Sequence, residues 1–174
     1  MEKAVRDSYG RTIEYMRISI TDRCNLRCIY CMPQTRKTYL RQEELLTYDE
    51  IVKLAGIYRS LGIKNVKLTG GEPLVREHIE ELIFRLKKEC GMGKVTLTTN
   101  GILLEQQLDG LVKAGLDGVN ISLDTLNPEH YNSLTGGCHV DRNPSDGNLE
   151  AVLRGMRKAQ KQAGISVKVN CVLM

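Results

Sequence analysis

The segment CNLRCIYC, residues 24–31, places three of the six cysteines of this 174-residue chain close together. Their spacing is C-x3-C-x2-C, and the segment follows a run of alternating apolar residues that predicts a strand. Three thiolates that converge from one loop can hold a soft metal ion or an iron-sulfur cluster, whereas a cysteine that fills a core is usually solitary. We therefore predict a metal centre built from Cys24, Cys28 and Cys31.

More than one kind of metal centre remains open at this loop. A structural zinc site takes four ligands, commonly as paired C-x2-C units, and the chain has no second pair. A catalytic zinc site needs three protein ligands, and His78, His130 and His139 are available but have no ligand spacing. An iron-sulfur cluster held by three thiolates leaves one iron free to bind a small molecule. The spacing favours the cluster.

Length and composition predict one domain over residues 1–174, with 41% hydrophobic residues and a net charge of +4. The first eleven residues lack the apolar core of a signal peptide, and no later apolar run is long enough for a membrane span. We therefore expect a cytoplasmic chain with no membrane partner. Its cysteines should then be reduced or bind metal. A single Phe and no Trp argue against a nucleic-acid partner. The basic residues of 154–161 have helical spacing and indicate a solvated helix face.

Hydrophobic periodicity predicts five strands separated by helices. The predicted strands are residues 16–20, 65–69, 94–99, 119–124 and 167–173. Thr47 and Glu50 predict a capping box at the start of one helix, and the predicted helices end near Gly62, Gly91, Gly115 and Gly164. Residues 127–148 are predicted as a long polar loop, which is functional, mobile or contains a short helix that the pattern does not locate.

The repeated order of strand, helix, glycine and strand predicts an α/β fold with a parallel sheet or a (β/α) barrel. One face of every predicted strand is polar, and a sealed barrel core of such residues would leave many polar groups without partners. The helices should therefore cover the apolar faces. The polar faces should line a cavity for a polar, largely anionic ligand, the alternative being an exposed concave face that binds nothing. The polar residues are Arg17, Ser19, Lys67, Thr69, Thr96, Thr98, Asn120, Ser122, Asp124, Lys168 and Asn170.

Several further segments, read together with the cysteine spacing, carry a resemblance to a known family. They are Gly10-Arg11, RISITDR at 17–23, Cys31-Met32-Pro33, LTGGEPL at 68–74, LTTNG at 97–101, VNISLD at 119–124 and VKVN at 167–170. The cysteine spacing resembles that of radical S-adenosylmethionine (SAM) enzymes, and the flanking residues resemble the GTP 3′,8-cyclase family, which begins molybdenum cofactor biosynthesis. This resemblance implies a partial radical SAM (β/α) barrel of about five parallel strands with outer helices.

The resemblance also implies roles for individual residues. It makes Cys24, Cys28 and Cys31 the ligands of a 4Fe-4S cluster. The implied SAM contacts are Tyr30, Gly71 and Ser122, and the implied GTP contacts are Arg17, Lys67, Thr98 and Lys168. At Gly71 the absence of a Cβ would let the backbone approach the SAM amino group. Lys67 replaces the more familiar arginine and lacks its planar fork.

The implied activity is that of a lyase that converts GTP to 3′,8-cyclo-7,8-dihydroguanosine 5′-triphosphate through a 5′-deoxyadenosyl radical. Two alternatives remain open: a radical SAM enzyme with another substrate, and an iron-sulfur-binding module without catalysis. SAM-side motifs are shared more widely than substrate-side motifs, so these motifs indicate SAM more directly than they indicate the substrate.

The chain also departs from the family pattern. Residues 136–147 form a longer loop, in which Cys138 and His139 are read as incidental, while Cys90 and Cys171 are read as packing residues. The family continues through a sixth strand and a C-terminal region whose cysteines hold a second cluster, and neither is encoded here. We therefore expect a barrel that is incomplete at the C-terminus, inactive alone in full GTP turnover, and prone to form homodimers through its fifth strand.

Overall fold

The computed structural model describes residues 4–31, 38–136 and 147–173. Its strands are β1 (Tyr15–Ser19), β2 (Asn65–Thr69), β3 (Lys94–Thr99), β4 (Gly118–Ser122) and β5 (Ser166–Asn170). Its α-helices are α1 (Tyr48–Ser60), α2 (Ile79–Lys88), α3 (Leu104–Ala114), α4 (Pro128–Thr135) and α5 (Asn148–Lys161), and two short 3-10 helices are η1 (Gln42–Glu44) and η2 (Pro73–Val75).

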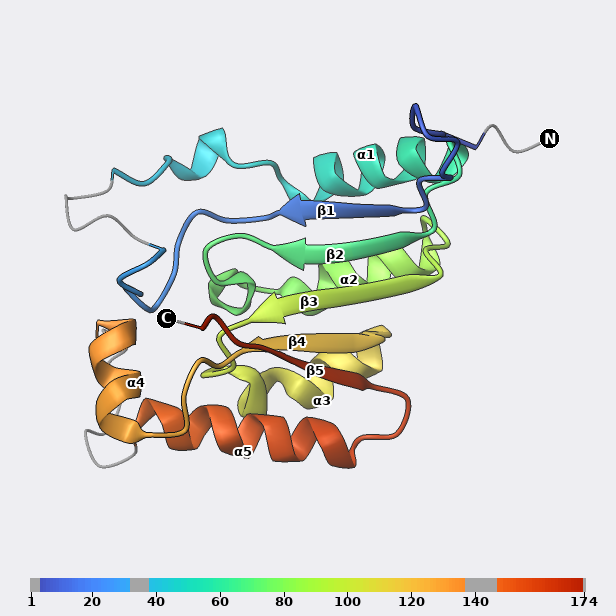
Figure 1. The fold of residues 1–174 in the computed structure, drawn as a ribbon. Helices are drawn as coiled ribbons and strands as arrows, with labels where there is room; N and C mark the ends of the chain where they lie inside the picture. Colours follow the sequence, from blue (N-terminus) through green and yellow to red (C-terminus); the bar gives the residue numbers. More distant parts are fainter. Residues whose placement is uncertain (1–3, 32–37, 137–146, 174) are drawn as a thin grey trace.

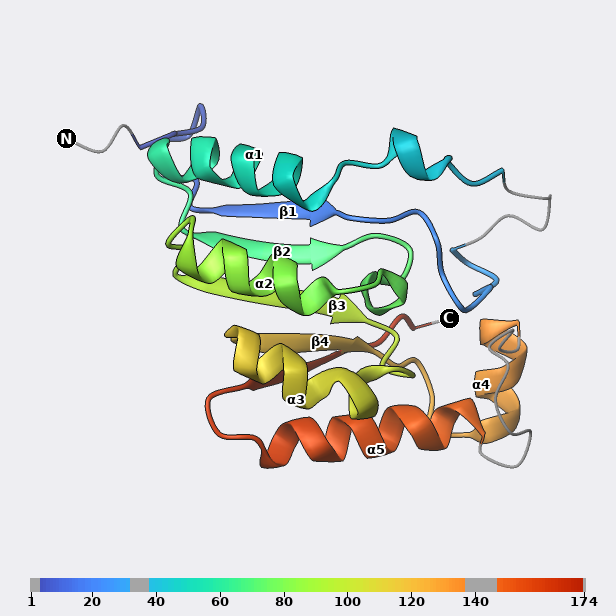
Figure 2. The same ribbon diagram turned by 180° about the vertical axis from the view of Figure 1, so that it is seen from behind.

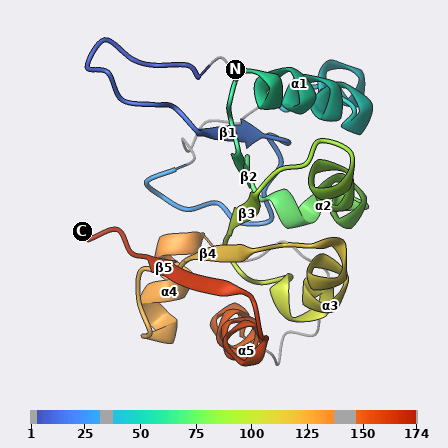
Figure 3. The same cartoon turned by 90° about the vertical axis from the view of Figure 1, so that its right-hand side faces the viewer.

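The strands form one parallel sheet in the order β1-β2-β3-β4-β5. Helices α1, α2, α3 and α5 cover its outer side, and Figure 3 shows the inner side curving away from them as an open concave face. The cysteine loop, α4 and the C-terminal residues gather at the carboxyl ends of the strands (Figures 1 and 2). The predicted fold of about five parallel strands with outer helices, a partial (β/α) barrel, is confirmed.

The two faces of the sheet divide as the alternation predicts. Val66, Leu68, Leu97 and Ile121 are almost completely buried against the helices, and burying one such side chain contributes about 1.5–3 kcal/mol. The residues between them face the concave side. The parallel register places Arg17 beside Lys67 and sets Asn120 between Thr98 and Lys168.

Local signals fix the helix ends. The capping box predicted at α1 is present: the Thr47 side chain accepts from the Glu50 amide, and the Glu50 carboxylate accepts from the Thr47 amide at 2.8 Å. Helix α3 ends at Gly115, whose φ of 99° is accessible to glycine without strain. Among the described helices, none is both long enough and apolar enough to cross a lipid bilayer.

Two sequence predictions need correction, and a third is decided among its alternatives. The fourth and fifth strands end earlier than predicted, because the Val172 amide donates to the Asp124 side chain at 2.8 Å rather than to a backbone carbonyl of β4. Of the alternatives for the polar segment 127–148, the structure shows a short helix, α4, which the Asn127 side chain caps by accepting from the His130 amide at 3.0 Å. Cys171 is exposed and its thiol donates to the Asp124 carbonyl, so it is not a packing residue.

Candidate functional site

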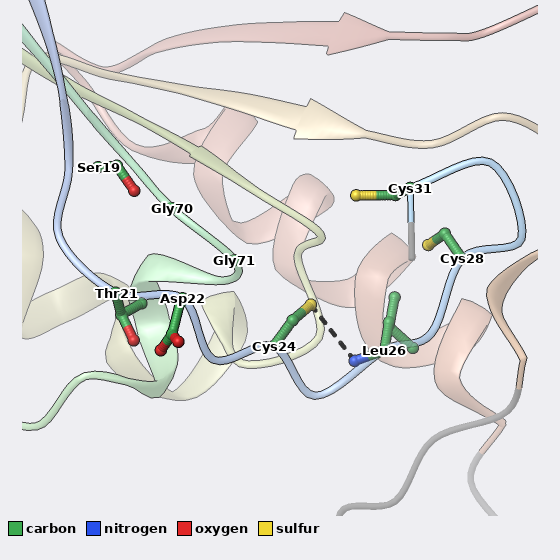
Figure 4. A pocket seen from close by; sticks show the side chains of 9 residues that line it. All are labelled: Ser19, Thr21, Asp22, Cys24, Leu26, Cys28, Cys31, Gly70 and Gly71. Atoms are coloured by element: carbon green, nitrogen blue, oxygen red, sulfur yellow. Dashed lines mark hydrogen bonds between the residues drawn. The ribbon is translucent and has the colours of Figure 1, made fainter. Parts of the chain in front are cut away.

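A pocket of about 260 Å³ lies where the cysteine loop faces the carboxyl ends of β1 and β2. Its lining residues are Ser19, Thr21, Asp22, Cys24, Leu26, Cys28, Cys31, Gly70 and Gly71. Figure 4 shows the side chains of the three cysteines extending from the loop into this space. The structure therefore brings together the three residues that the sequence spacing predicts as metal ligands.

The C-terminal end of α4 holds the cysteine loop by its backbone. The amides of Arg27 and Ile29 donate to the carbonyls of Thr135 and Leu134, each at 2.9 Å. These carbonyls belong to the last turn of the helix, where no intrahelical donor is available for them. Gly136 lies so close to the loop that an added Cβ would be 2.7 Å from the Arg27 carbonyl oxygen. The helix that sequence periodicity missed is thus part of the support of the predicted metal site.

The first half of the loop is held by polar side chains. The Asn100 side-chain amide donates to the Asn25 side-chain oxygen at 2.6 Å, which joins the loop to the end of β3. The Arg27 guanidinium donates to the Cys24 carbonyl at 2.8 Å, and the Leu26 amide lies 3.4 Å from the Cys24 sulfur. An amide directed at sulfur stabilises a thiolate, so this contact partly offsets the effect of burial, which raises the pKa of the Cys24 thiol.

The glycines after β2 pack directly against the backbone that leads into the cysteine loop. A Cβ on Gly70 would be 2.3 Å from the Thr21 carbonyl oxygen, and a Cβ on Gly71 would be 2.2 Å from the Arg23 carbonyl oxygen. The Gly71 amide also donates to the Thr21 carbonyl at 2.7 Å. This close packing is a structural reason for both glycines, additional to the approach of SAM that the resemblance implies.

Glu72, which sequence reasoning passed over as a site residue, is 1% exposed and directly follows Gly71, which lines the pocket. Its carboxylate accepts from the Asn100 amide at 2.6 Å, the Thr99 hydroxyl at 2.7 Å and the Leu74 amide at 3.0 Å. Burial raises the pKa of this carboxyl from 4.5 to about 7, against the opposing effect of the three donors. Glu72 therefore joins the ends of β2 and β3 at the base of the site.

The donor set suits a cluster of iron and sulfide. Burial raises the pKa of the Cys24 and Cys28 thiols, which keeps them protonated until a metal displaces the proton. Within the described ranges no group of three His, Cys, Asp or Glu side chains is arranged around a single ion. The thiolates of a four-iron cluster bind different irons, so they need not surround one point. One oxygen of Asp22, Oδ1, is buried in this region without a hydrogen-bond partner among the described residues, which leaves an acceptor for a ligand.

The three residues implied as SAM contacts occupy different positions. Gly71 lines the pocket, whereas Ser122 ends β4 on the concave side, opposite Asn170 in the register. The Tyr30 hydroxyl donates to the Asp124 carboxylate. Burial, followed by this bond, raises the pKa of Tyr30 well above its ordinary value of 10, so the phenol remains a donor.

Cations line the concave face below the pocket. Arg17 and Lys67 are adjacent on β1 and β2, and Lys168 lies on β5 two strands from Thr98. Lys67 has its ammonium 5.9 Å from the centre of the Tyr15 ring. The ion pairs found among the described residues involve other cations, so the positive charge of these three is uncompensated by neighbouring carboxylates. Such a face attracts anions.

Of the three remaining cysteines, Cys90 and Cys171 lie in the described part of the chain. Cys90 packs against the core and its thiol donates to the Val52 carbonyl at 3.4 Å, which confirms its reading as a packing residue. Cys138 and His139 lie outside the described residues. Glu72 and Asn100 are site residues that sequence reasoning did not single out, and Asp124 was predicted to line the cavity but was given no individual role. The available signal was their position, since each directly follows or nearly follows the carboxyl end of a parallel strand.

The cysteine loop, its pocket and the parallel sheet together point to one class of protein. The family model "Radical SAM superfamily" matches residues 18–174, and the chain belongs to this superfamily. Within it, the chain is 45% identical over 168 residues to a GTP 3′,8-cyclase of Petrotoga mobilis, which covers 97% of the chain and 49% of that protein. It is 44% identical over 168 residues to molybdenum cofactor biosynthesis protein 1 of Dictyostelium discoideum, covering 97% of the chain and 25% of that protein. The chain spans about half the length of the Petrotoga cyclase and about a quarter of the length of the Dictyostelium protein.

Solved structures of other radical SAM proteins share the fold. Methylornithine synthase (PylB) superposes with a TM-score of 0.67 at 20% sequence identity, over 92% of this chain and 45% of that one. Streptococcus suis SuiB bound to S-adenosylmethionine gives a TM-score of 0.63 at 19% identity, over 91% of this chain and 32% of that one. At these identities the likeness concerns the fold.

Proposed function

We propose that this chain provides the cluster, SAM and GTP contacts of a radical SAM GTP 3′,8-cyclase, the enzyme that begins molybdenum cofactor biosynthesis. The observation that carries the proposal is the position of three cysteines at one end of a concave face whose uncompensated cations lie below them. The relatives named GTP 3′,8-cyclase support it.

The cofactor end of the site would be held by the cysteine loop. Cys24, Cys28 and Cys31 would bind a 4Fe-4S cluster, which when bound supplies the electron that cleaves SAM to a 5′-deoxyadenosyl radical. Gly71, Tyr30 and Ser122 are the proposed SAM contacts. The unpaired Asp22 oxygen adds an acceptor in the same pocket, suited to a donor group of the ligand.

The substrate end would be held by the concave face. Arg17, Lys67 and Lys168 present positive charge for the triphosphate, and Thr98 presents a hydroxyl between the two groups of cations. Holding GTP at several points fixes its ribose relative to SAM. The sheet would lie against one side of the bound ligands, while the open concave face of this chain leaves their other side in contact with water.

Anaerobic reconstitution with iron and sulfide, followed by SAM cleavage with dithionite, tests this proposal. We expect deoxyadenosine to form, and its formation to increase when GTP is present. Deoxyadenosine formation indifferent to GTP would favour a radical SAM enzyme with another substrate. Cluster binding without SAM cleavage would favour a module without catalysis. The Cys28→Ala variant is the control, because it removes a proposed cluster ligand.

A further inference from the structure

The Asp124 carboxylate lies where three segments of the chain meet. Asp124 follows the end of β4, and one of its oxygens accepts a hydrogen bond from the Tyr30 hydroxyl in the cysteine loop. The other oxygen accepts from the Val172 amide, which follows the end of β5, at 2.8 Å. A single carboxylate thus connects the cysteine loop to the carboxyl ends of two neighbouring strands.

We propose that Asp124 is a positioning residue, which fixes the Cys28–Cys31 end of the cysteine loop over the pocket through the Tyr30 hydroxyl. The significance of this position for SAM rests on the function proposed above. That Asp124 positions the cysteine loop is argued from the contacts of the loop alone, independently of SAM.

The contacts of the loop show why this bond matters. Its first half is joined to the sheet through Asn25 and Asn100. Its middle is bonded to α4 through the amides of Arg27 and Ile29. After Ile29, the described contact that reaches the sheet is the bond from Tyr30 to Asp124, since the Cys31 amide donates only within the loop, to the Cys28 carbonyl at 2.9 Å.

The chemistry of the bond makes it stronger than an ordinary surface contact. A hydroxyl that donates to an ionised carboxylate forms a shorter and stronger bond than one between neutral groups. No ion pair among the described residues involves Asp124, so its two recorded side-chain bonds come from Tyr30 and Val172. Tyr30 is bonded through its hydroxyl although 44% of the residue is exposed, so phenylalanine can replace it without opening a cavity.

Hydrogen exchange of the chain without metal tests the connection directly. In Tyr30→Phe and in Asp124→Ala we expect peptides covering residues 24–31 to exchange about fivefold faster, the effect of losing roughly one hydrogen bond. The double variant should exchange no faster than Tyr30→Phe, because Asp124→Ala removes the same bond to Asp124 and Tyr30→Phe alone also removes the contact of this hydroxyl with the Cys28 thiol. Asp124→Asn, which keeps an acceptor of similar shape, should restore much of the protection.

Two control variants separate this bond from general effects. Tyr58→Phe removes a hydroxyl from a similarly exposed tyrosine on α1, and Asp109→Ala removes a carboxylate on α3 that pairs with Lys158 at 2.9 Å. Both should leave residues 24–31 unchanged. Unchanged exchange in Tyr30→Phe overturns the proposal, and so does a change in Asp124→Ala confined to residues 170–173, which would assign Asp124 to β5 alone.

A spectroscopic measurement tests the consequence for SAM. We expect reconstituted Asp124→Ala, which leaves the proposed SAM contacts in place, to hold iron and sulfide as the parent does, but to need severalfold more SAM to shift the electron paramagnetic resonance spectrum of the reduced cluster. The same SAM dependence in parent and variant would overturn the functional part of the proposal. A parent chain that binds no cluster would instead refute the proposed function, and the exchange result would still decide the role of Asp124.

Discussion

The buried carboxyl of Glu72 predicts an unusual dependence of stability on pH. Its pKa is about 7 in the folded chain against an ordinary value of 4.5, which we take for the unfolded chain. Because the folded state holds the proton more tightly, the contribution to stability is complete below pH 4.5 and is lost as the pH rises through 7. From these two pKa values, the contribution of Glu72 to the free energy of unfolding should fall by roughly 2–3 kcal/mol between pH 5 and pH 8.

The variant Glu72→Gln isolates this effect. Glutamine does not titrate, and its amide group can accept at one position only, so a buried donor among Thr99, Leu74 and Asn100 loses its acceptor. We expect the unfolding free energy of the parent minus that of the variant to decrease by roughly 2–3 kcal/mol from pH 5 to pH 8, since contributions of other groups cancel.

Urea denaturation at four pH values, under reducing conditions and without metal, measures this difference. Glu50→Gln is the matched control: Glu50 is exposed, and its bonds to Thr47 lower its pKa, so its contribution should be constant over this range. Parallel pH profiles for the parent and Glu72→Gln would refute the assignment of the raised pKa to burial of Glu72.

Four further predictions follow from the site and its surroundings. Cys28→Ala should abolish cluster binding in iron and sulfide analysis, whereas Cys90→Ala, which changes a packing residue, should not. Arg17→Ala and Lys168→Ala should each weaken GTP binding in calorimetry by about 1.5–3 kcal/mol while sparing the cluster, and equal affinities would contradict the phosphate assignment. Gly71→Ala should destabilise the fold in thermal melts because its Cβ meets the Arg23 backbone, whereas Gly110→Ala, which has open space in α3, should stabilise it by about 0.5–1 kcal/mol. The outer edge of β5, where Val169 is 50% exposed, should support homodimers in analytical ultracentrifugation, and a strictly monomeric chain at high concentration would contradict this.

Much of the fold could be predicted because it rests on local patterns. The alternation of Val66, Lys67 and Leu68 fixes which face of β2 meets the helices, and Gly115 ends α3 as expected. A short helix was among the alternatives for residues 127–148, but α4 was not located because it spans only eight residues and has a weak apolar stripe. The pair Asn127 and Pro128 was its available signal, as a capping residue followed by proline at the first helical position.

The candidate site was predicted unevenly for a physical reason. The three cysteines could be predicted as metal ligands from their spacing, because a soft metal needs several thiolates close together. Glu72, Asn100 and Asp124 act through partners that are distant in sequence, so nothing near them along the chain reveals the contact. Cys171 looked like a packing residue while its strand was predicted to run through it. The strand stops at Asn170, and the cysteine is left exposed.

The joint between Gly70–Glu72 and Thr21–Arg23 has a consequence for how such a chain can change over evolution. The joint is made of backbone bonds, Gly71 to Thr21 at 2.7 Å and Glu72 to Arg23 at 2.8 Å. It therefore depends on two glycines rather than on particular partner side chains. The residues of the concave face lie on the strands below and do not contribute to it. On the function proposed above, strand residues could be exchanged for new substrates while the end proposed to hold the cofactor stays intact. The architecture then lets the two ends of the site change independently of each other.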